Sequence, residues 1–258
     1  GPQEVSSSHL TIAPVPQERW DGEDFFRNRV TWITFHEPIE EFTLTLRTQT
    51  TRLQQSPRMD LSSALGQLAK DVAAIQSVAP HAPQHFLGRS PRVAPGPVMT
   101  DFAQALVAPE MSAFQAVLAI GKALNAELDF DSEATDVLTT PEEAFEQRRG
   151  VCQDFSHIMI ACLRGLGVPA GYVSGFLRTI PPPGQKRMEG ADAMHAWVRA
   201  WCGAEMGWVE YDPTNATLVG EAHVVVAYGR DYSDVSPVRG TLRSAGVHDT
   251  KHFVDVVP

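Results

Sequence analysis

Residues 150–177 read GVCQDFSHIMIACLRGLGVPAGYVSGFL, and this stretch decides how the rest of the chain is interpreted. Gly150 interrupts the preceding segment, and apolar residues then recur at three- and four-residue steps, the period of a helix with a buried face. These apolar residues are Phe155, Ile158, Met159, Cys162, Leu163 and Leu166. Gly165 and the Gly167-Val168-Pro169 run are typical of a helix end. The pattern predicts a helix whose N-terminus lies at Cys152 or just after it.

The position of Cys152 leaves two interpretations open. At a helix N-terminus, unpaired N–H groups and the positive end of the dipole stabilise a thiolate, the nucleophilic form of cysteine. A free cysteine is more often a small buried hydrophobe, and position alone does not separate the two. Cys162 lies ten residues further on, about 280° around the helix, and is expected to pack in the core. Cys202 follows Trp201 at a strand end and is also expected to be structural.

A cysteine nucleophile needs a base, and the base needs a group that orients it. Residues 193–202 (AMHAWVRAWC) and 208–212 (WVEYD) are predicted strands, each with alternate side chains on one face. If Gly203-Ala204 forms a two-residue hairpin turn, His195 stands directly opposite Asp212. Their Cβ atoms would then lie about 4.5–5.5 Å apart, close enough for the carboxylate to accept a hydrogen bond from the imidazole. A longer loop would shift this register.

The other histidines near these segments are weaker candidates for the base. His157 lies five residues after Cys152 on the same helix, and the helical rotation turns it away. His223 precedes the apolar run VVVAY and is expected to be a strand-end residue. A metal site formed by His195, His223 and Asp212 is an alternative, but these residues lack a recognisable ligand spacing. The sequence therefore favours His195 as the base and predicts neither a metal nor another cofactor.

The front of the chain is predicted to form a small antiparallel β domain. Residues 42–47 alternate apolar and polar side chains, which is the period of a half-buried strand. Residues 30–35 (VTWITF) predict a second strand and residues 10–12 a weaker third, whereas residues 19–29 (RWDGEDFFRNR) carry turn signals. Ser56-Pro57 marks the end of this domain, because the residue before a proline avoids helical geometry.

Helices and one irregular connector are predicted between this domain and Gly150. Helical spacing of apolar residues covers 61–75 and 113–128. Residues 141–147 (PEEAFEQ) begin with a proline and carry acids in the first turn, both of which favour a helix start. Residues 79–97 contain five prolines and are expected to form a surface connector.

Composition argues against several classes of protein. The 258 residues carry 21 Lys and Arg against 31 Asp and Glu, a net charge of −10 that disfavours nucleic acid and polybasic membrane anchoring. No stretch approaches the roughly 18 apolar residues of a membrane span, and no signal peptide is visible. Three cysteines are too few for a disulfide framework. We therefore expect a cytoplasmic globular protein with one large domain or two small ones.

Four segments resemble, in this order, the motifs of the bacterial transglutaminase-like cysteine enzymes. They are residues 150–177, 195–201 (HAWVRAW), 207–215 (GWVEYDPTN) and 223–240 (HVVVAYGRDYSDVSPVRG). The resemblance covers about Thr100 to the C-terminus, and the front segment is similar to the β domain that usually precedes this core. It implies an α+β fold with a papain-like core, in which the cysteine-bearing helix packs on an antiparallel sheet. The expected domains are the N-terminal β domain (1–57), a helical segment with the Pro-rich connector (58–105) and the catalytic core (106–258).

This chain departs from the family pattern at two points. The family usually has a further strand or hairpin before the point where this chain starts, which leaves open whether the front sheet is incomplete. Gly171 stands where the family usually has an arginine, which puts any charge contact at that point in doubt.

Carried over residue by residue, the resemblance matches Cys152 to the nucleophile, His195 to the general base and Asp212 to the orienting carboxylate. The implied reaction is acyl transfer from a peptide or protein amide through a thioester. Water as the acceptor would make the protein a peptidase or amidase, which the resemblance favours, whereas an amine would make it a transglutaminase. A catalytically idle peptide-binding or scaffold module is the remaining alternative. The sequence does not specify the oligomeric state.

Three further residues are candidates for substrate contact. Gln153 lies beside the nucleophile and could help to hold the oxyanion. Trp197 and Trp208 either pack in the core or form the walls of an acyl channel. Asp154 is expected to cap the helix rather than take part in the chemistry. Residues 129–136 (DFDSEATD) lack the glycine and glutamate of a calcium loop and are expected to be solvated.

Overall fold

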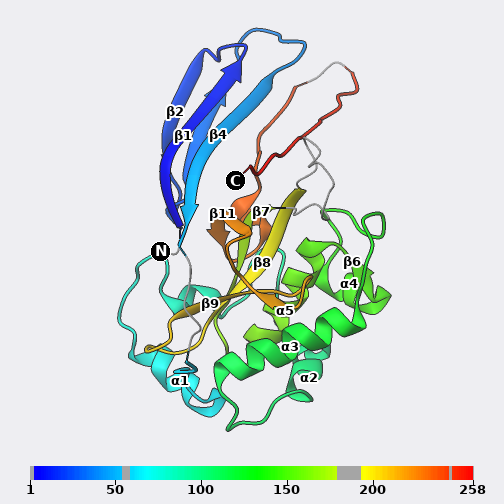
Figure 1. Cartoon of the computed structure of the whole chain (residues 1–258). Coiled ribbons are helices and arrows are strands. Elements are labelled where there is room, and N and C mark those ends of the chain that lie inside the picture. Colours follow the sequence, from blue (N-terminus) through cyan, green and yellow to red (C-terminus); the bar gives the residue numbers. More distant parts are fainter. Residues whose placement is uncertain (1–2, 54–58, 179–192, 244–245, 258) are drawn as a thin grey trace, which may run out of the picture. The chain divides into compact units, whose positions relative to one another are not determined.

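The computed structural model describes residues 3–53, 59–178, 193–243 and 246–257 (Figure 1). The chain folds into two compact units, Gly1–Pro57 and Arg58–Pro258. Within the described residues, the first unit consists of strands, and the second combines helices with a five-stranded sheet. The prediction of an α+β fold is therefore confirmed.

The first unit contains two antiparallel strand pairs, as predicted for a β domain. Strand β1 (Gln3–Ala13) pairs with β4 (Thr43–Arg52), and β2 (Glu18–Glu23) pairs with β3 (Arg29–Thr34). The interpretation of residues 19–29 as turns was wrong for their first half, which forms β2. Trp20 faces Trp32 across the pair with ring centroids 4.3 Å apart, and such aromatic cross-strand pairs stabilise strands.

The second unit is built on a fully antiparallel sheet with the strand order β10-β9-β8-β7-β11. Its strands are β7 (Ala170–Leu177), β8 (Ala193–Trp201), β9 (Trp208–Asp212), β10 (Thr217–Leu218) and β11 (His223–Gly229). The helices are α1 (Leu65–Ala74), η1 (Pro83–Phe86), α2 (Pro97–Gln104), α3 (Ala113–Glu127), α4 (Pro141–Gln147), α5 (Cys152–Gly165) and α6 (Tyr232–Val235). A short parallel pair joins β5 (Asp129–Phe130) to β6 (Arg149–Gly150). Among the described helices, none has the length and apolar character needed to cross a bilayer.

Helix α5 forms the centre of the core, and it begins at Cys152 as predicted. Every residue from Gln153 to Arg164 is buried, because α5 packs against β7 and β8 on one side and against α2, α3 and α4 on the other (Figure 1). A helix covered all round needs apolar side chains on most of its surface, which this sequence supplies. The helix ends at Gly165, and Gly167, two residues later, has a φ of +77°, the left-handed geometry typical of a glycine just after a helix.

The proline-rich segment 79–97 is more deeply packed than the sequence indicates. Phe86 and Val93 are fully buried, which corrects the prediction of a surface connector. The ring centroids of Phe86 and Trp208 lie 5.0 Å apart, and the Arg199 guanidinium carbon lies 4.5 Å above the centroid of the Phe86 ring. The prolines set an irregular backbone path, whereas the apolar residues between them decide which part of that path is buried.

Candidate active site

Three elements of the second unit bring the predicted cysteine, histidine and aspartate together. Cys152 is the first residue of α5, His195 lies in β8, and Asp212 ends the neighbouring strand β9. Helix α5 packs against β8, so the N-terminus of the helix reaches the histidine of the strand. The side-chain hydrogen bonds of His195 include one to Cys152 and one to Asp212.

The register of the β8–β9 hairpin differs from the prediction by two residues. Val198 pairs with Tyr211, and the loop between the strands runs from residue 202 to residue 207 instead of over two residues. Gly203 and Gly207 have φ values of +108° and +69°, so this wider loop uses left-handed backbone at both glycines. A shift of two residues keeps side chains on the same face, and His195 Nε2 lies 2.7 Å from Asp212 Oδ2. The predicted contact is therefore present, although the two residues are not directly opposite each other.

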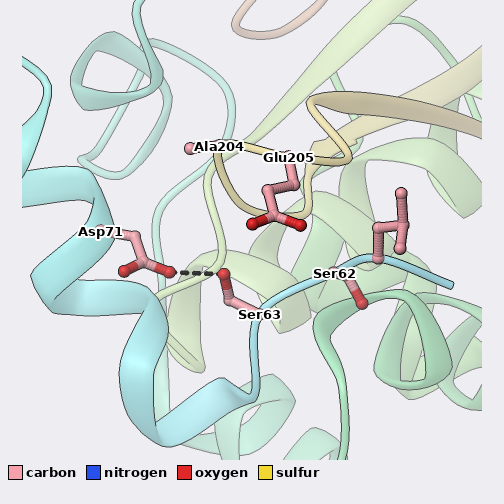
Figure 2. A pocket seen from close by; sticks show the side chains of 6 residues that line it. Ser62, Ser63, Asp71, Ala204 and Glu205 are labelled. Atoms are coloured by element: carbon pink, nitrogen blue, oxygen red, sulfur yellow. Dashed lines mark hydrogen bonds between the residues drawn. The ribbon is translucent and has the colours of Figure 1, made fainter.

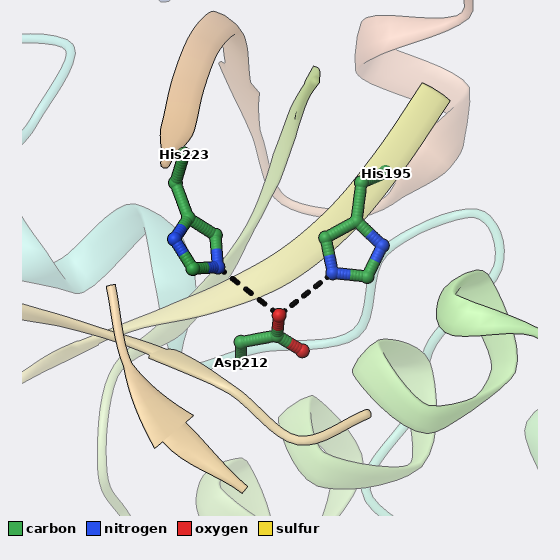
Figure 3. Close-up of side chains that lie close together, drawn as sticks. All are labelled: His195, Asp212 and His223. Atoms are coloured by element: carbon green, nitrogen blue, oxygen red, sulfur yellow. Dashed lines mark hydrogen bonds and ion pairs between the residues drawn. The ribbon is translucent and has the colours of Figure 1, made fainter. Parts of the chain in front are cut away.

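Asp212 is a fully buried carboxylate with five hydrogen-bond donors. Oδ1 accepts from the backbone N–H groups of Thr214 and Asn215 at 3.0 and 3.2 Å. Oδ2 accepts from His195 and, at 3.1 Å, from His223 (Figure 3). It also accepts from the Asn215 side chain at 2.8 Å. Burial alone would raise the pKa of Asp212, but these hydrogen bonds and the charge of His195 hold it well below its usual range. Asp212 is therefore ionised at neutral pH.

The environment of His195 favours its protonated form. Burial lowers the pKa of an imidazole, but hydrogen bonds to Asp212 and Cys152 outweigh burial and raise the pKa of His195 to about 9. Because Nε2 is engaged with Asp212, Nδ1 is the nitrogen left for Cys152. Cys152 is half-buried, whereas Cys162 and Cys202 are buried as predicted, and burial raises the pKa of Cys162 to about 12.

The sequence placed His223 beside His195 and Asp212 only in the alternative of a metal site, and otherwise as a strand-end residue. It begins β11 and donates to the same carboxylate oxygen as His195 (Figure 3). The candidate ligand atoms of His195, Asp212 and His223 all lie within 4.8 Å of one another, as a metal site would require. However, the Gly220 N–H donates to His223 Nδ1 at 3.3 Å, which places the proton of the neutral ring on Nε2. A protonated Nε2 cannot bind a metal, so the donor set fits a hydrogen-bonded carboxylate better.

Comparison with known proteins identifies the family. The sequence profile of the transglutaminase-like superfamily matches residues 100–213, and that of the bacterial transglutaminase-like N-terminal region matches residues 1–51. The chain belongs to the transglutaminase-like superfamily.

Relatives and a solved structure match most of the chain. Uncharacterized proteins of Mycobacterium bovis and Mycobacterium tuberculosis are each 31% identical to this chain over an alignment of 276 residues, gaps included. Each alignment covers 99% of this chain and 82% of the relative. The structure of a "putative cysteine protease" from Cytophaga hutchinsonii superposes with a TM-score of 0.63 at 20% identity. It covers 91% of this chain and 73% of its own, and at this identity it shows a shared fold.

Of the other candidates in the transglutaminase-like core, two lie near Cys152, His195 and Asp212 and one does not. Gln153 is buried in the first turn of α5, next to Cys152. Trp197 is fully buried, its ring centroid lies 6.1 Å from that of His195, and its Nε1 donates to Glu210. Trp208 begins β9, at the opposite end of the strand from Asp212, and donates to the His81 carbonyl at 3.1 Å. Trp208 is therefore not brought to the site.

Asp154 and His157 contact protein groups near the start of α5. The Asp154 carboxylate accepts from the Val151 N–H at 2.8 Å and from Thr135 Oγ1 at 2.6 Å, which confirms the predicted capping role. His157 is buried, and its Nε2 accepts the Tyr232 N–H at 3.2 Å. Both side chains support the helix and its surroundings.

A pocket elsewhere in the second unit is a weaker candidate site. It lies between the segment before α1, α1 itself and the β8–β9 loop (Figure 2). Its lining residues are Leu61, Ser62, Ser63, Asp71, Ala204 and Glu205, and the Ser63 hydroxyl donates to Asp71. None of these residues is a cysteine or a histidine, so the pocket lacks the nucleophile and base that Cys152 and His195 supply.

Proposed function

We propose that the protein is a cysteine-dependent enzyme that cleaves amide bonds through a thioester on Cys152, with water as the final acceptor. One observation carries this proposal. His195 makes side-chain hydrogen bonds both to Asp212, at 2.7 Å, and to Cys152 at the start of a buried helix. Nucleophile, base and orienting carboxylate arranged in this way are the recurring solution for activating a weak nucleophile.

The electrostatics of the pair support an activated thiol. The helix N-terminus and a neighbouring imidazolium both stabilise a thiolate relative to a thiol. The pKa of His195, raised to about 9, keeps the imidazole protonated when Cys152 has lost its proton. Asp212 remains ionised and holds Nε2, which fixes the orientation of the ring.

The reaction then proceeds in two halves. The Cys152 sulfur forms a bond to the amide carbonyl carbon, and the proton on His195 passes to the leaving amine as the C–N bond breaks. Water next attacks the thioester, His195 takes a proton from that water, and the C–S bond breaks to release a carboxylic acid and restore the thiolate–imidazolium pair. Asp212 keeps its charge throughout and stabilises the imidazolium.

The start of α5 offers donors for the oxyanion. The N–H groups of Asp154 and Phe155 both reach the Val151 carbonyl, at 2.9 and 3.1 Å. The N–H groups of Cys152 and Gln153 have no acceptor within the helix, as at any helix N-terminus. We assign the Cys152 N–H to the oxyanion, with Gln153 as the candidate for the second donor.

A mixed peptide library tests the proposal. The purified protein is incubated with the library, with and without methylamine, and the products are identified by mass spectrometry. We expect new peptide termini, or glutamine side chains converted to glutamate, with wild type and none with Cys152→Ala. Methylamine adducts in place of hydrolysis would assign the transglutaminase reaction instead. Equal products from wild type and Cys152→Ala would contradict the proposal.

A further inference from the structure

The Asp212 carboxylate is shared by two imidazoles, although the proposed chemistry uses only one. His195 Nε2 and His223 Nε2 contact the same oxygen, Oδ2, at 2.7 and 3.1 Å. His195 is oriented toward Cys152, whereas the second nitrogen of His223 is occupied by the Gly220 N–H at 3.3 Å. His223 therefore contacts Asp212 on one side and, on the other, the backbone of Gly220, which lies just before β11.

The surroundings of His223 restrain its ring. The residue is 5% exposed. Its ring and the Trp197 ring pack edge to face, with an interplanar angle of 80° and centroids 5.2 Å apart. Trp197 is itself fixed, since it is fully buried and its Nε1 donates to Glu210 Oε2 at 2.9 Å. A restrained donor of this kind can hold the carboxylate in one orientation at little entropic cost on each turnover.

We propose that His223 is a positioning residue that acts on His195 through Asp212. Its N–H donation keeps Oδ2 directed at His195 Nε2, and this contact in turn stabilises the imidazolium beside the Cys152 thiolate. This inference rests on the proposed function, because it concerns the ionisation of the same cysteine. Neither imidazole nitrogen of His223 is left for substrate, since Asp212 and Gly220 occupy both.

Two substitutions separate the contact to Asp212 from the contact to Gly220. The amide nitrogen of His223→Gln can reach the position of Nε2 and donate to Asp212. The amide of His223→Asn is shorter and reaches only the position of Nδ1, where its oxygen can accept the Gly220 N–H. The measurement is the rate of iodoacetamide labelling of Cys152 in the full chain from pH 5 to 9.5, with Cys152→Ser as the labelling control and thermal melting as the folding control.

We expect His223→Asn to raise the pH midpoint of Cys152 labelling by about one unit, so that labelling slows about tenfold at pH values well below both midpoints. At pH 9.5 its rate should meet that of wild type, because every accessible thiol is then ionised. His223→Gln should keep the wild-type midpoint. If His223→Asn does not fold, the wild-type midpoint of a folded His223→Gln still supports the proposal, and a raised midpoint overturns it.

The opposite pattern would overturn the inference alone. If wild type labels at pH 6 and His223→Asn has the same midpoint, His223 does not act through Asp212, and the proposed function stands. A raised midpoint in His223→Gln together with a normal one in His223→Asn would assign His223 to the Gly220 contact instead. If wild type does not label at pH 6, the proposed function fails, and this inference fails with it.

Discussion

Two histidines of the second unit, the half-buried His195 and the buried His157, each lie near a buried aspartate, yet their environments favour opposite protonation states. The pKa of His195, beside Asp212, is raised to about 9. The pKa of His157, near Asp231, is lowered by burial to about 4. Proximity of a carboxylate is therefore not enough to make a buried histidine a base.

The difference lies in how the hydrogen bonds of each aspartate are used. Asp212 Oδ2 lies directly on His195 Nε2. The oxygens of Asp231 accept the backbone N–H groups of Arg92 and Ser233, at 2.7 and 2.8 Å. His157 instead accepts a backbone N–H through its own Nε2, which requires that nitrogen to be unprotonated. A direct hydrogen bond to the carboxylate thus separates His195 from His157.

Replacing each histidine by glutamine should give the largest contrast. His195→Gln should lower amide turnover about 10³-fold or more, because the thiol loses its base. His157→Gln should leave turnover near wild type and cost about 1–3 kcal/mol of stability, because a buried hydrogen-bond partner is replaced. Turnover is followed on any peptide cleaved by wild type, and stability by urea denaturation. Comparable losses of turnover in the two folded variants would remove the distinction.

The two aspartates should separate in the same way. Asp212→Asn should lower turnover roughly 10²- to 10⁴-fold, since the charge that stabilises the imidazolium is gone. Asp231→Asn should affect mainly the melting temperature. The His195→Ala/Asp212→Ala double variant should be scarcely slower than His195→Ala, because the two residues act as one unit. Full additivity of the two losses would indicate separate roles.

The smallest expected effect is on stability against pH. The folded-state pKa of His157, about 4, lies below its ordinary value of 6.5. As pH falls, His157 is therefore protonated in the unfolded chain before it is protonated in the folded chain. The free energy of unfolding then decreases as pH falls from 6.5 toward 4, by on the order of 1–3 kcal/mol. His195 has a raised pKa, so its contribution is present below pH 6.5 and is lost as pH rises through 9.

Urea denaturation of Cys152→Ala measures both slopes. Asp212 alone still raises the pKa of His195 in this variant, so the alkaline loss is expected at a lower pH than in wild type. Adding His157→Gln should flatten the loss of stability on the acid side. Adding His195→Gln should flatten the loss on the alkaline side. Unchanged slopes in both double variants would contradict the opposite environments of the two histidines.

The sequence predicts one part of the site better than another. The start of α5 at Cys152 and the shared face of His195 and Asp212 follow from local periods, and a shift of two residues in the hairpin does not change which face a side chain lies on. The register itself depends on a loop in which Gly203 and Gly207 adopt left-handed backbone, and nothing in the residue pattern fixed the length of that loop. His223 begins β11, which β7 and β8 separate from β9 in the sheet, so its contact with Asp212 is long-range and has no local signal in the sequence.

The most direct test of the central claim is intact-mass spectrometry after treatment of the folded protein with iodoacetamide at pH 6. Ordinary thiols, with a pKa of about 8.5, are almost wholly protonated there, and Cys162 and Cys202 are buried. Activation of Cys152 by His195 and Asp212 predicts rapid addition of a single label that is absent from Cys152→Ala. No label on the folded wild type, or the same label on Cys152→Ala, would contradict it.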